Sequence, residues 1–116
     1  LRTLAPYETA YVGKYEGGLL QRDMAYHNGT VWPWLMGPFV SAYCRTRGHS
    51  LRSRMYAKEL LDGFTPHLAE AGIGSISEIC DGDEPHLPGG CVAQAWSVAE
   101  ILRAYSEDVL LKNMRR

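Results

Sequence analysis

The sequence has no excess of positive charge and few cysteines. Twelve Lys and Arg against thirteen Asp and Glu give a formal net charge of -1, so no basic field is present to hold a nucleic acid phosphate backbone. The three cysteines, Cys44, Cys80 and Cys91, form no CxxC pair. We therefore expect no nucleic acid partner, reduced thiols and a cytoplasmic protein.

Long hydrophobic runs are also absent. The run from Val31 to Val40 is interrupted by two prolines and a glycine, and it is far shorter than the ~20 residues that a membrane span needs. The first residues include neither a start methionine nor the apolar core of a signal peptide. We expect no membrane partner, and we expect the 116 residues to form one unit at most, cut from something longer.

Three segments show apolar residues at helical spacing, which predicts an all-α chain of helical hairpins with long functional loops. The predicted helices cover residues 32–47, the segment between Ser50 and Gly72, and Cys91 to Leu110. Residues 6–30 show no sustained period, so we expect an ordered but irregular segment there.

The helix ends and interruptions follow from single residues. Thr30 is the candidate cap of the first helix and Ser50 that of the second. Pro38 removes one backbone hydrogen bond near the start of the first helix and should bend it, unless a local turn absorbs the distortion. Pro66 should kink or interrupt the second helix.

The apolar residues of the second and third predicted helices form stripes. The stripe of the second helix consists of Leu51, Met55, Leu60, Leu61, Phe64 and Leu68, and that of the third consists of Val92, Ala95, Trp96, Ala99 and Leu102. Such stripes are typical of the face that a helix turns to a core.

The loop from Gly74 to His86 gathers an imidazole and the carboxylates of Glu78, Asp81, Asp83 and Glu84. Paired carboxylates are the usual equipment for glycoside hydrolysis. Glu78 has apolar neighbours in a glycine-flanked loop, which suits a general base that is partly shielded from water. The alternative is a loop carboxylate that caps backbone amides.

Metal binding has little support in this loop. The D-G-D-E run from Asp81 to Glu84 matches only a fragment of a calcium loop and is more typical of a turn, with Asp83 available to a sugar hydroxyl or a helix amide. The spacing of His86, Cys80 and Cys91 matches no zinc site. We expect neither a metal nor a cofactor.

Aromatic and polar side chains of the chain suit a carbohydrate. The rings are those of Trp32, Trp34 and Trp96, and the polar groups are those of Tyr26, His27, Asn28 and Gln94. Trp96 lies on the apolar stripe of the third helix, which favours a place in the core, and the same alternative is open for Trp34. Trp32, at the junction of loop and helix, is the better sugar platform.

Several spaced motifs resemble one enzyme family. The run YHNGTVWPWLMGPF from Tyr26 to Phe39 resembles the C-terminal part of bacterial and archaeal glycogen debranching enzymes of the amylo-α-1,6-glucosidase type. The run EICDGD from Glu78 to Asp83 resembles the closing block of that family, together with Pro85-His86, Cys91 and the run AQAWSVAE. Matches at Leu1-Arg2-Thr3-Leu4 and Tyr15-Glu16-Gly17-Gly18 extend the resemblance over nearly the whole chain.

The resemblance implies the C-terminal part of an (α/α)6 barrel of the six-hairpin glycosidase kind. It further implies α-glucan as the partner, hydrolysis of α-1,6 branch linkages with inversion, and Glu78 as the catalytic base. The residues that fall in the motif blocks expected to line or support the glucan pocket are Trp32, Trp34, His27, Asp81, His86 and Gln94. Departures from the family at Asn28, Cys80, Glu84 and Gly89 leave the fine substrate specificity open.

A barrel of twelve helices needs on the order of 180 residues, and 116 residues cannot complete it. We therefore expect residues 1–116 to be a single C-terminal segment of a glycoside hydrolase catalytic domain, with the acid upstream of Leu1 and no activity in the isolated segment. Two alternatives stay open. One is a noncatalytic α-glucan-binding module, and the other is a helical module that forms a homo-oligomer through exposed barrel surfaces.

Overall fold

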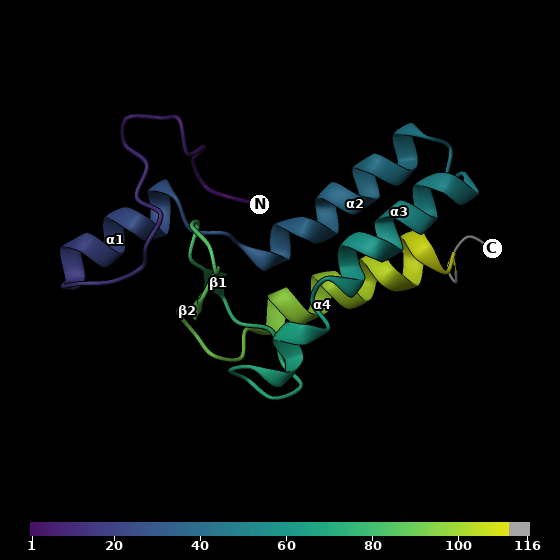
Figure 1. Cartoon of the computed structure of the whole chain (residues 1–116). Helices are drawn as coiled ribbons and strands as arrows, with labels where there is room; N and C mark the ends of the chain where they lie inside the picture. Colours follow the sequence, from purple (N-terminus) through teal and green to yellow (C-terminus); the bar gives the residue numbers. More distant parts are fainter. Residues whose placement is uncertain (112–116) are drawn as a thin grey trace.

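The computed structural model describes residues 1–111, and most of its regular structure is helical. Helix α2 (Met36–Thr46) packs against both α3 (Leu51–Asp62) and α4 (Ala95–Ala104), whereas α1 (Leu19–Asn28) stands apart from these three (Figure 1). The all-α class predicted from the sequence is confirmed. None of the helices within residues 1–111 has the length and apolar character needed to cross a membrane.

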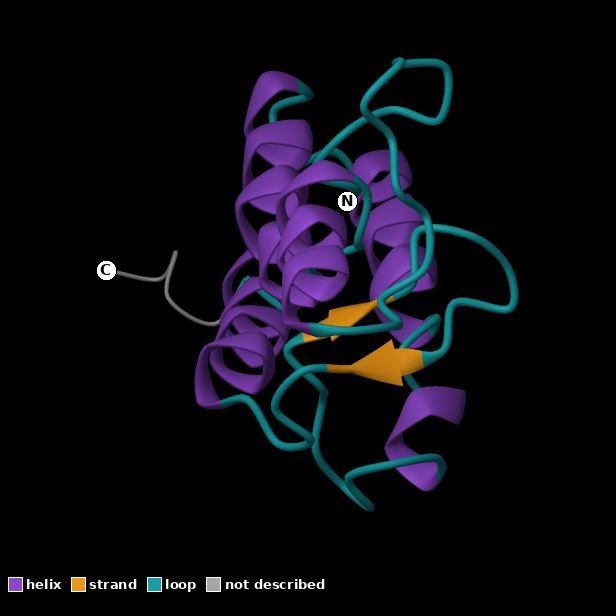
Figure 2. Ribbon diagram, turned by 90° about the vertical axis from the view of Figure 1, so that its left-hand side faces the viewer, coloured by secondary structure: helices purple, strands orange, loops and turns teal. Residues whose placement is uncertain are grey.

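One small antiparallel ladder was not predicted. Strand β1 (Ile79–Cys80) pairs with β2 (Pro88–Gly89), with Ile79 opposite Gly89 and Cys80 opposite Pro88 (Figure 2). The ladder lies inside the loop from Gly74 to His86 and its continuation, and it gives that loop a defined shape. Two residues per strand are too few for an alternation of apolar and polar side chains to be recognised in the sequence.

Two prolines begin short 3₁₀ helices, Pro33–Leu35 and Pro66–Ala69. The first of these runs directly into α2, so Pro38 falls in the first turn of α2, where a backbone N–H has no intrahelical partner. The local turn therefore absorbs the distortion expected there. Pro66 interrupts the second predicted helix as expected, since α3 ends before it.

The prediction of an irregular segment over residues 6–30 is wrong for Leu19–Asn28, which form helix α1. Ala25 is its one buried residue, and Leu19, Leu20 and Met24 are exposed, so no apolar period marks it in the sequence. Good helix formers nevertheless fill it, and Gly29 closes it with a backbone bond to the Ala25 carbonyl oxygen.

Two helix starts also differ from expectation. The third predicted helix begins at Ala95 rather than at Cys91, and a π-helical turn, Tyr105–Val109, completes it. Ser50 caps α3 as predicted, because its side chain accepts a hydrogen bond from the backbone N–H of Ser53. Thr30 caps no helix, since its hydroxyl donates to the Tyr26 carbonyl oxygen at 3.0 Å.

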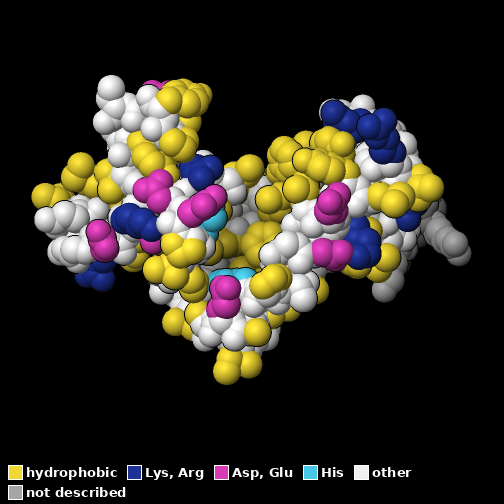
Figure 3. All heavy atoms as spheres, in the orientation of Figure 1, with side chains coloured by type: hydrophobic (Ala, Val, Ile, Leu, Met, Phe, Trp, Pro, Cys, Tyr) yellow, Lys and Arg dark blue, Asp and Glu magenta, His cyan; other side chains and the backbone are white. Residues whose placement is uncertain are grey.

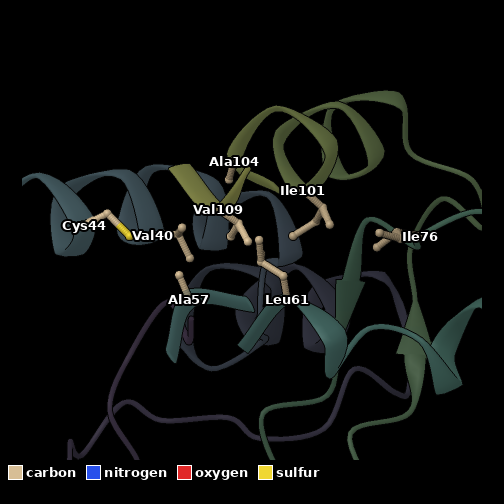
Figure 4. Packing of buried hydrophobic residues seen from close by; sticks show 8 residues of the cluster. All are labelled: Val40, Cys44, Ala57, Leu61, Ile76, Ile101, Ala104 and Val109. Carbon is tan, nitrogen blue, oxygen red and sulfur yellow. The ribbon is translucent and has the colours of Figure 1, made fainter. Parts of the chain in front are cut away.

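The core lies between α2, α3, α4 and the π-helical turn (Figure 4). Residues four apart on α2 face residues four apart on α3, and α4 and the turn close the cluster. Its members are Val40, Cys44, Ala57, Leu61, Ile76, Ile101, Ala104 and Val109. Because Ile76 belongs to this cluster, the core also holds the start of the loop from Gly74 to His86.

Most of the predicted apolar stripes do not enter that core. Leu51 and Met55 of α3 are 69% and 63% exposed, and Leu102 of α4 is 64% exposed. The buried faces of α3 and α4 instead present small residues such as Ser53, Ala57, Ser97 and Ala104. Small side chains let helices approach closely. Several larger apolar side chains of the stripes, such as Leu51, Met55 and Leu102, are left on the outer faces.

The N-terminal segment contacts the end of α1 and the loop from Gly74 to His86, which we call the acidic loop. Arg2 pairs with Val31, and Val31 pairs with Cys80, in isolated antiparallel bridges. Gly82 lies so close to the carbonyl oxygen of Gly29 that an added Cβ would collide with it. These contacts hold the end of α1 beside β1.

Candidate functional site

Glu78 immediately precedes β1, and both oxygens of its half-buried carboxylate have a donor. The Tyr26 hydroxyl donates to Oε1 at 2.6 Å, and the backbone N–H of Cys91 donates to Oε2 at 2.9 Å. The backbone N–H of Glu78 in turn donates to the Cys91 carbonyl oxygen at 2.9 Å. The carboxylate therefore has a fixed direction. The sequence left two roles open for Glu78, a general base and a cap of backbone amides. Only Oε2 accepts from a backbone amide.

Tyr26 is a hydroxyl donor throughout the ordinary pH range. Burial raises the pKa of Tyr26 to about 12, and the hydrogen bond and negative charge of Glu78 act in the same direction. The Tyr26 ring stands edge-on to Trp32, with 4.5 Å between the ring centroids. The Trp32 indole N–H donates to the Tyr26 carbonyl oxygen at 3.3 Å.

The tryptophans continue this aromatic contact away from Glu78. The centroids of Trp32 and Trp96 are 6.3 Å apart, and those of Trp96 and Trp34 are 5.3 Å apart with 31° between the ring planes. Trp96 is 47% exposed, so the interpretation of this residue as core is wrong. The register of α4 turns Ser97, not Trp96, to the buried side. We call Tyr26, Trp32, Trp96 and Trp34 the aromatic cluster.

A hollow of about 330 Å³ lies beside Glu78, within the ~300 to 1,000 Å³ of small-ligand pockets. Its lining consists of Tyr15, Leu19, Arg22, Asp23, Tyr26 and Glu78. On a larger scale, the surface is also indented between the part of the molecule that carries α1 and the part that carries α2 and α3, with hydrophobic side chains in that indentation (Figure 3). The rings of Tyr15 and Tyr26 form an aromatic wall of this hollow beside its charged groups, a combination that suits a ligand with apolar ring faces and many hydroxyls.

A larger hollow, about 780 Å³, follows the outer face of α3. Leu51, Met55 and Tyr56 supply its apolar lining, and none of the predicted site residues borders it. Its lining also includes the carboxylates of Glu59 and Asp62, but every lining residue belongs to the single helix α3, so this hollow is an exposed helix face. The smaller hollow at Glu78 is therefore the better candidate site.

The acidic loop distributes its carboxylates among different partners. Asp81 is buried and accepts from the backbone N–H of Tyr15 at 2.8 Å, while Asp83 accepts from the Tyr11 hydroxyl at 2.8 Å. Glu84 is exposed. Of these four carboxylates, all of which the structure describes, only Glu78 lines the hollow.

Two predicted residues lie next to the hollow. His27 follows Tyr26 on α1, where its exposed ring stands edge-on to the Tyr26 ring and its Nε2 is 3.8 Å from Asp23 Oδ1. Asp81 reaches the hollow indirectly, because it holds the backbone of Tyr15, which lines it.

Two other predicted residues contact the loop backbone. His86 Nδ1 is 2.9 Å from the Asp81 carbonyl oxygen, and His86 borders a different hollow with Leu1 and Cys80. The backbone N–H of Gln94 donates to the Ile76 carbonyl oxygen at 2.9 Å, directly before α4 begins.

Sequence reasoning missed Leu19, Arg22 and Asp23 as lining residues. With Tyr26 they recur at positions i, i+3, i+4 and i+7, which places them on one face of α1. That spacing could have revealed the face, but its mixed polar and apolar character gives no hydrophobic period. The signal that could have revealed this face of α1 is the recurrence of charged and aromatic residues at helical spacing.

The cysteines and histidines form no metal centre in the described chain. Among residues 1–111, no three His, Cys, Asp or Glu side chains gather where they could hold an ion. The thiols of Cys44, Cys80 and Cys91 are free, and burial raises the pKa of Cys80 to about 11.

Comparison with known proteins identifies one family. The family model described as amylo-alpha-1,6-glucosidase matches residues 1–103, a range that contains the whole hollow and the whole aromatic cluster. No solved structure matches the chain. The family match confirms the resemblance to glycogen debranching enzymes predicted from the motifs.

Proposed function

The chain belongs to the amylo-α-1,6-glucosidase family, and from this premise we propose that it carries the base half of a site hydrolysing α-1,6-glucosidic branch linkages. The substrate is an α-glucan such as glycogen. Glu78 is the general base, and the general acid is a carboxylate upstream in the same polypeptide. The observation that carries the proposal is the Glu78 carboxylate, which lines a hollow beside an aromatic wall and has a defined donor at each oxygen.

In this proposal the chemistry is single displacement with inversion. The upstream acid protonates the glycosidic oxygen of the leaving group while Glu78 takes a proton from water, whose oxygen attacks the anomeric carbon from the opposite face. Each oxygen of Glu78 accepts one hydrogen bond and keeps a further lone-pair site for that water. The room for the water requires a separation of ~6.5 to 9.5 Å between the two carboxyl groups.

The substrate-binding residues divide into two groups. Trp32 and Trp34 supply ring faces for sugar rings, and His27 at the exposed edge of α1 binds hydroxyls. Asp81, His86 and Gln94 act through the chain: they hold the backbone of Tyr15 and of the acidic loop. In this proposal they keep Glu78 in place and do not touch the sugar.

The test of the base is Glu78→Gln in the polypeptide that joins this chain to its upstream region. Hydrolysis of α-1,6 linkages should fall by about 10²- to 10⁴-fold, the usual contribution of a general base. Asp83→Asn is the matched control, because Asp83 also accepts from a tyrosine hydroxyl but lies outside the hollow. Unchanged activity in Glu78→Gln would refute the assignment. Proton NMR of the released glucose should show the β-anomer first.

The position of the acid has its own test. Asp23 is the second carboxylate that lines the hollow within residues 1–111. Asp23→Asn should weaken substrate binding and leave most of the turnover, because the acid lies upstream in this proposal. A loss as large as that of Glu78→Gln, or turnover by the 116-residue chain alone, would place the acid inside the chain.

A second candidate function is noncatalytic binding of α-glucan, and the half-exposed ring of Trp96, tilted against that of Trp34, favours it. Titration calorimetry of the 116-residue chain with maltooligosaccharides tests it. Binding that Trp32→Ala reduces would support this function, provided that Glu78→Gln has no effect on hydrolysis by the longer polypeptide. Absence of binding by the chain would count against it.

A further inference from the structure

Two tyrosine hydroxyls in the described chain donate to carboxylates: Tyr26 to Glu78 at 2.6 Å and Tyr11 to Asp83 at 2.8 Å. The first pair lines the hollow, and the second does not. We propose that Tyr26 is the positioning residue of the catalytic base, holding Oε1 of Glu78 so that the carboxylate is directed into the hollow. This inference rests on the proposed function of Glu78 as a base.

Tyr26 is itself held rigidly, as a positioning residue has to be. It belongs to the last turn of α1, and its carbonyl oxygen accepts from the Thr30 hydroxyl at 3.0 Å and from the Trp32 indole N–H at 3.3 Å. Its ring is fixed edge-on against Trp32. The hydroxyl therefore has little freedom to follow Glu78 if the carboxylate turns away.

The carboxylate is confined on its other side by the backbone. Gly90 has a φ of +68°, and a Cβ built there would lie 2.6 Å from Glu78 Oε2 and 3.2 Å from Glu78 Cβ. The Cys91 N–H holds Oε2 from the same side. Glu78 is thus fixed between a rigid backbone on one side and a single side-chain donor, Tyr26, on the other.

The Tyr26 hydroxyl and the Cys91 N–H contribute unequally to the orientation of the Glu78 carboxylate. The Cys91 N–H belongs to the backbone pairing of Glu78 with Cys91, and it anchors one oxygen about which the carboxylate can still rotate. A second donor at the other oxygen removes that rotation. A base acts only within about hydrogen-bond reach of the proton that it removes, so loss of direction lowers the rate of the chemical step.

The high pKa of Tyr26, about 12, agrees with this role. The hydroxyl keeps its proton wherever the enzyme works, so it donates to the carboxylate and leaves Glu78 as the acceptor. The other titratable side chains that line the hollow are those of Tyr15, Arg22 and Asp23.

The test compares Tyr26→Phe with Tyr11→Phe in the polypeptide that includes the upstream region. Phe keeps the ring and its packing on Trp32, so Tyr26→Phe should lower kcat by about 10- to 100-fold, the equivalent of one hydrogen bond to a charged group, with KM changed less than about threefold. Tyr11→Phe removes the matching tyrosine–carboxylate bond outside the hollow and should leave both constants unchanged.

A donor restored at position 26 separates loss of the hydrogen bond from loss of folded protein. p-Aminophenylalanine in place of Tyr26 keeps the ring and supplies an N–H, and it should recover most of the lost kcat. In a Glu78→Gln background, Tyr26→Phe should cause no further loss, because the group to be positioned is gone.

The outcomes distinguish the two proposals. Wild-type kcat in Tyr26→Phe, a raised KM without loss of kcat, or no recovery with p-aminophenylalanine would each refute the positioning role, while inactivity of Glu78→Gln would leave the proposed base intact. Full activity of Glu78→Gln would instead refute the base, and the positioning role with it.

Discussion

At the scale of single residues, Gly90 is the position where the backbone and the site constrain each other most directly. Its positive φ disfavours any side chain, and the space beside it is occupied by the Glu78 carboxylate. Glycine is therefore required here for two separable reasons.

We predict that Gly90→Ala costs more than backbone strain alone. Gly48 is the matched control, because it also has a positive φ, +59°, but has no atom within 4 Å of a built Cβ. Gly48→Ala should cost about 1 to 2 kcal/mol of stability, and Gly90→Ala should cost more and also lower hydrolysis by displacing Glu78. Urea unfolding and activity of both variants provide the measurement. Equal costs and equal activities would contradict the prediction.

The sequence could propose Glu78 as the base but could not predict its surroundings. Its family motif and its glycine-flanked loop are local features, readable from neighbouring residues. The hydrogen bond from Tyr26 joins residues 52 positions apart, and the lining of the hollow by Arg22 depends on a helix with no apolar period. Contacts of this kind depend on the fold, because nothing near either residue in the chain specifies its partner.

At the scale of elements, the end signals of α3 were readable and its buried face was not. Ser50 was predictable as a cap because a serine before a helical pattern satisfies a free backbone N–H. The face was mistaken because large apolar residues recur at helical spacing on the outer side, while Ser53 and Ala57 are buried. Periodicity marks an apolar face without saying what covers it.

We predict that Ser50→Ala destabilises the chain by about 1 kcal/mol, through loss of the acceptor for the Ser53 N–H. Ser50→Asn should retain most of the stability, since Asn is as good a cap. The measurement is the midpoint of urea unfolding at unchanged slope. A cost for Asn as large as that for Ala would show that the cap is not the cause.

At the scale of the whole molecule, the outer faces of several helices expose large apolar side chains to solvent. Leu51 and Met55 on α3, Leu102 on α4 and Leu19 on α1 are all more than 60% exposed. In the (α/α)6 barrel that the family resemblance implies, further helical hairpins would cover such faces. Without them, association of chains is the other way to remove this surface from water.

We therefore predict that the 116-residue chain self-associates in solution. Sedimentation velocity across a range of concentrations should show a rising sedimentation coefficient, and a Leu51→Lys, Met55→Lys double variant should weaken the association. Tyr7→Lys is the control, since Tyr7 is 86% exposed and lies outside these faces. A monodisperse monomer at all concentrations would contradict the prediction.

The aromatic cluster has one consequence for how this protein can be observed. The chain has three tryptophans, and all of them lie in this cluster, whereas the core between α2, α3 and α4 contains none. Its tryptophan fluorescence is therefore emitted by the aromatic cluster, whose member Tyr26 donates to Glu78. A sugar seated on the half-exposed Trp96 would change that emission without any added label. An unfolding curve recorded by tryptophan fluorescence reports on the aromatic cluster, and the helices around the core have to be followed by circular dichroism.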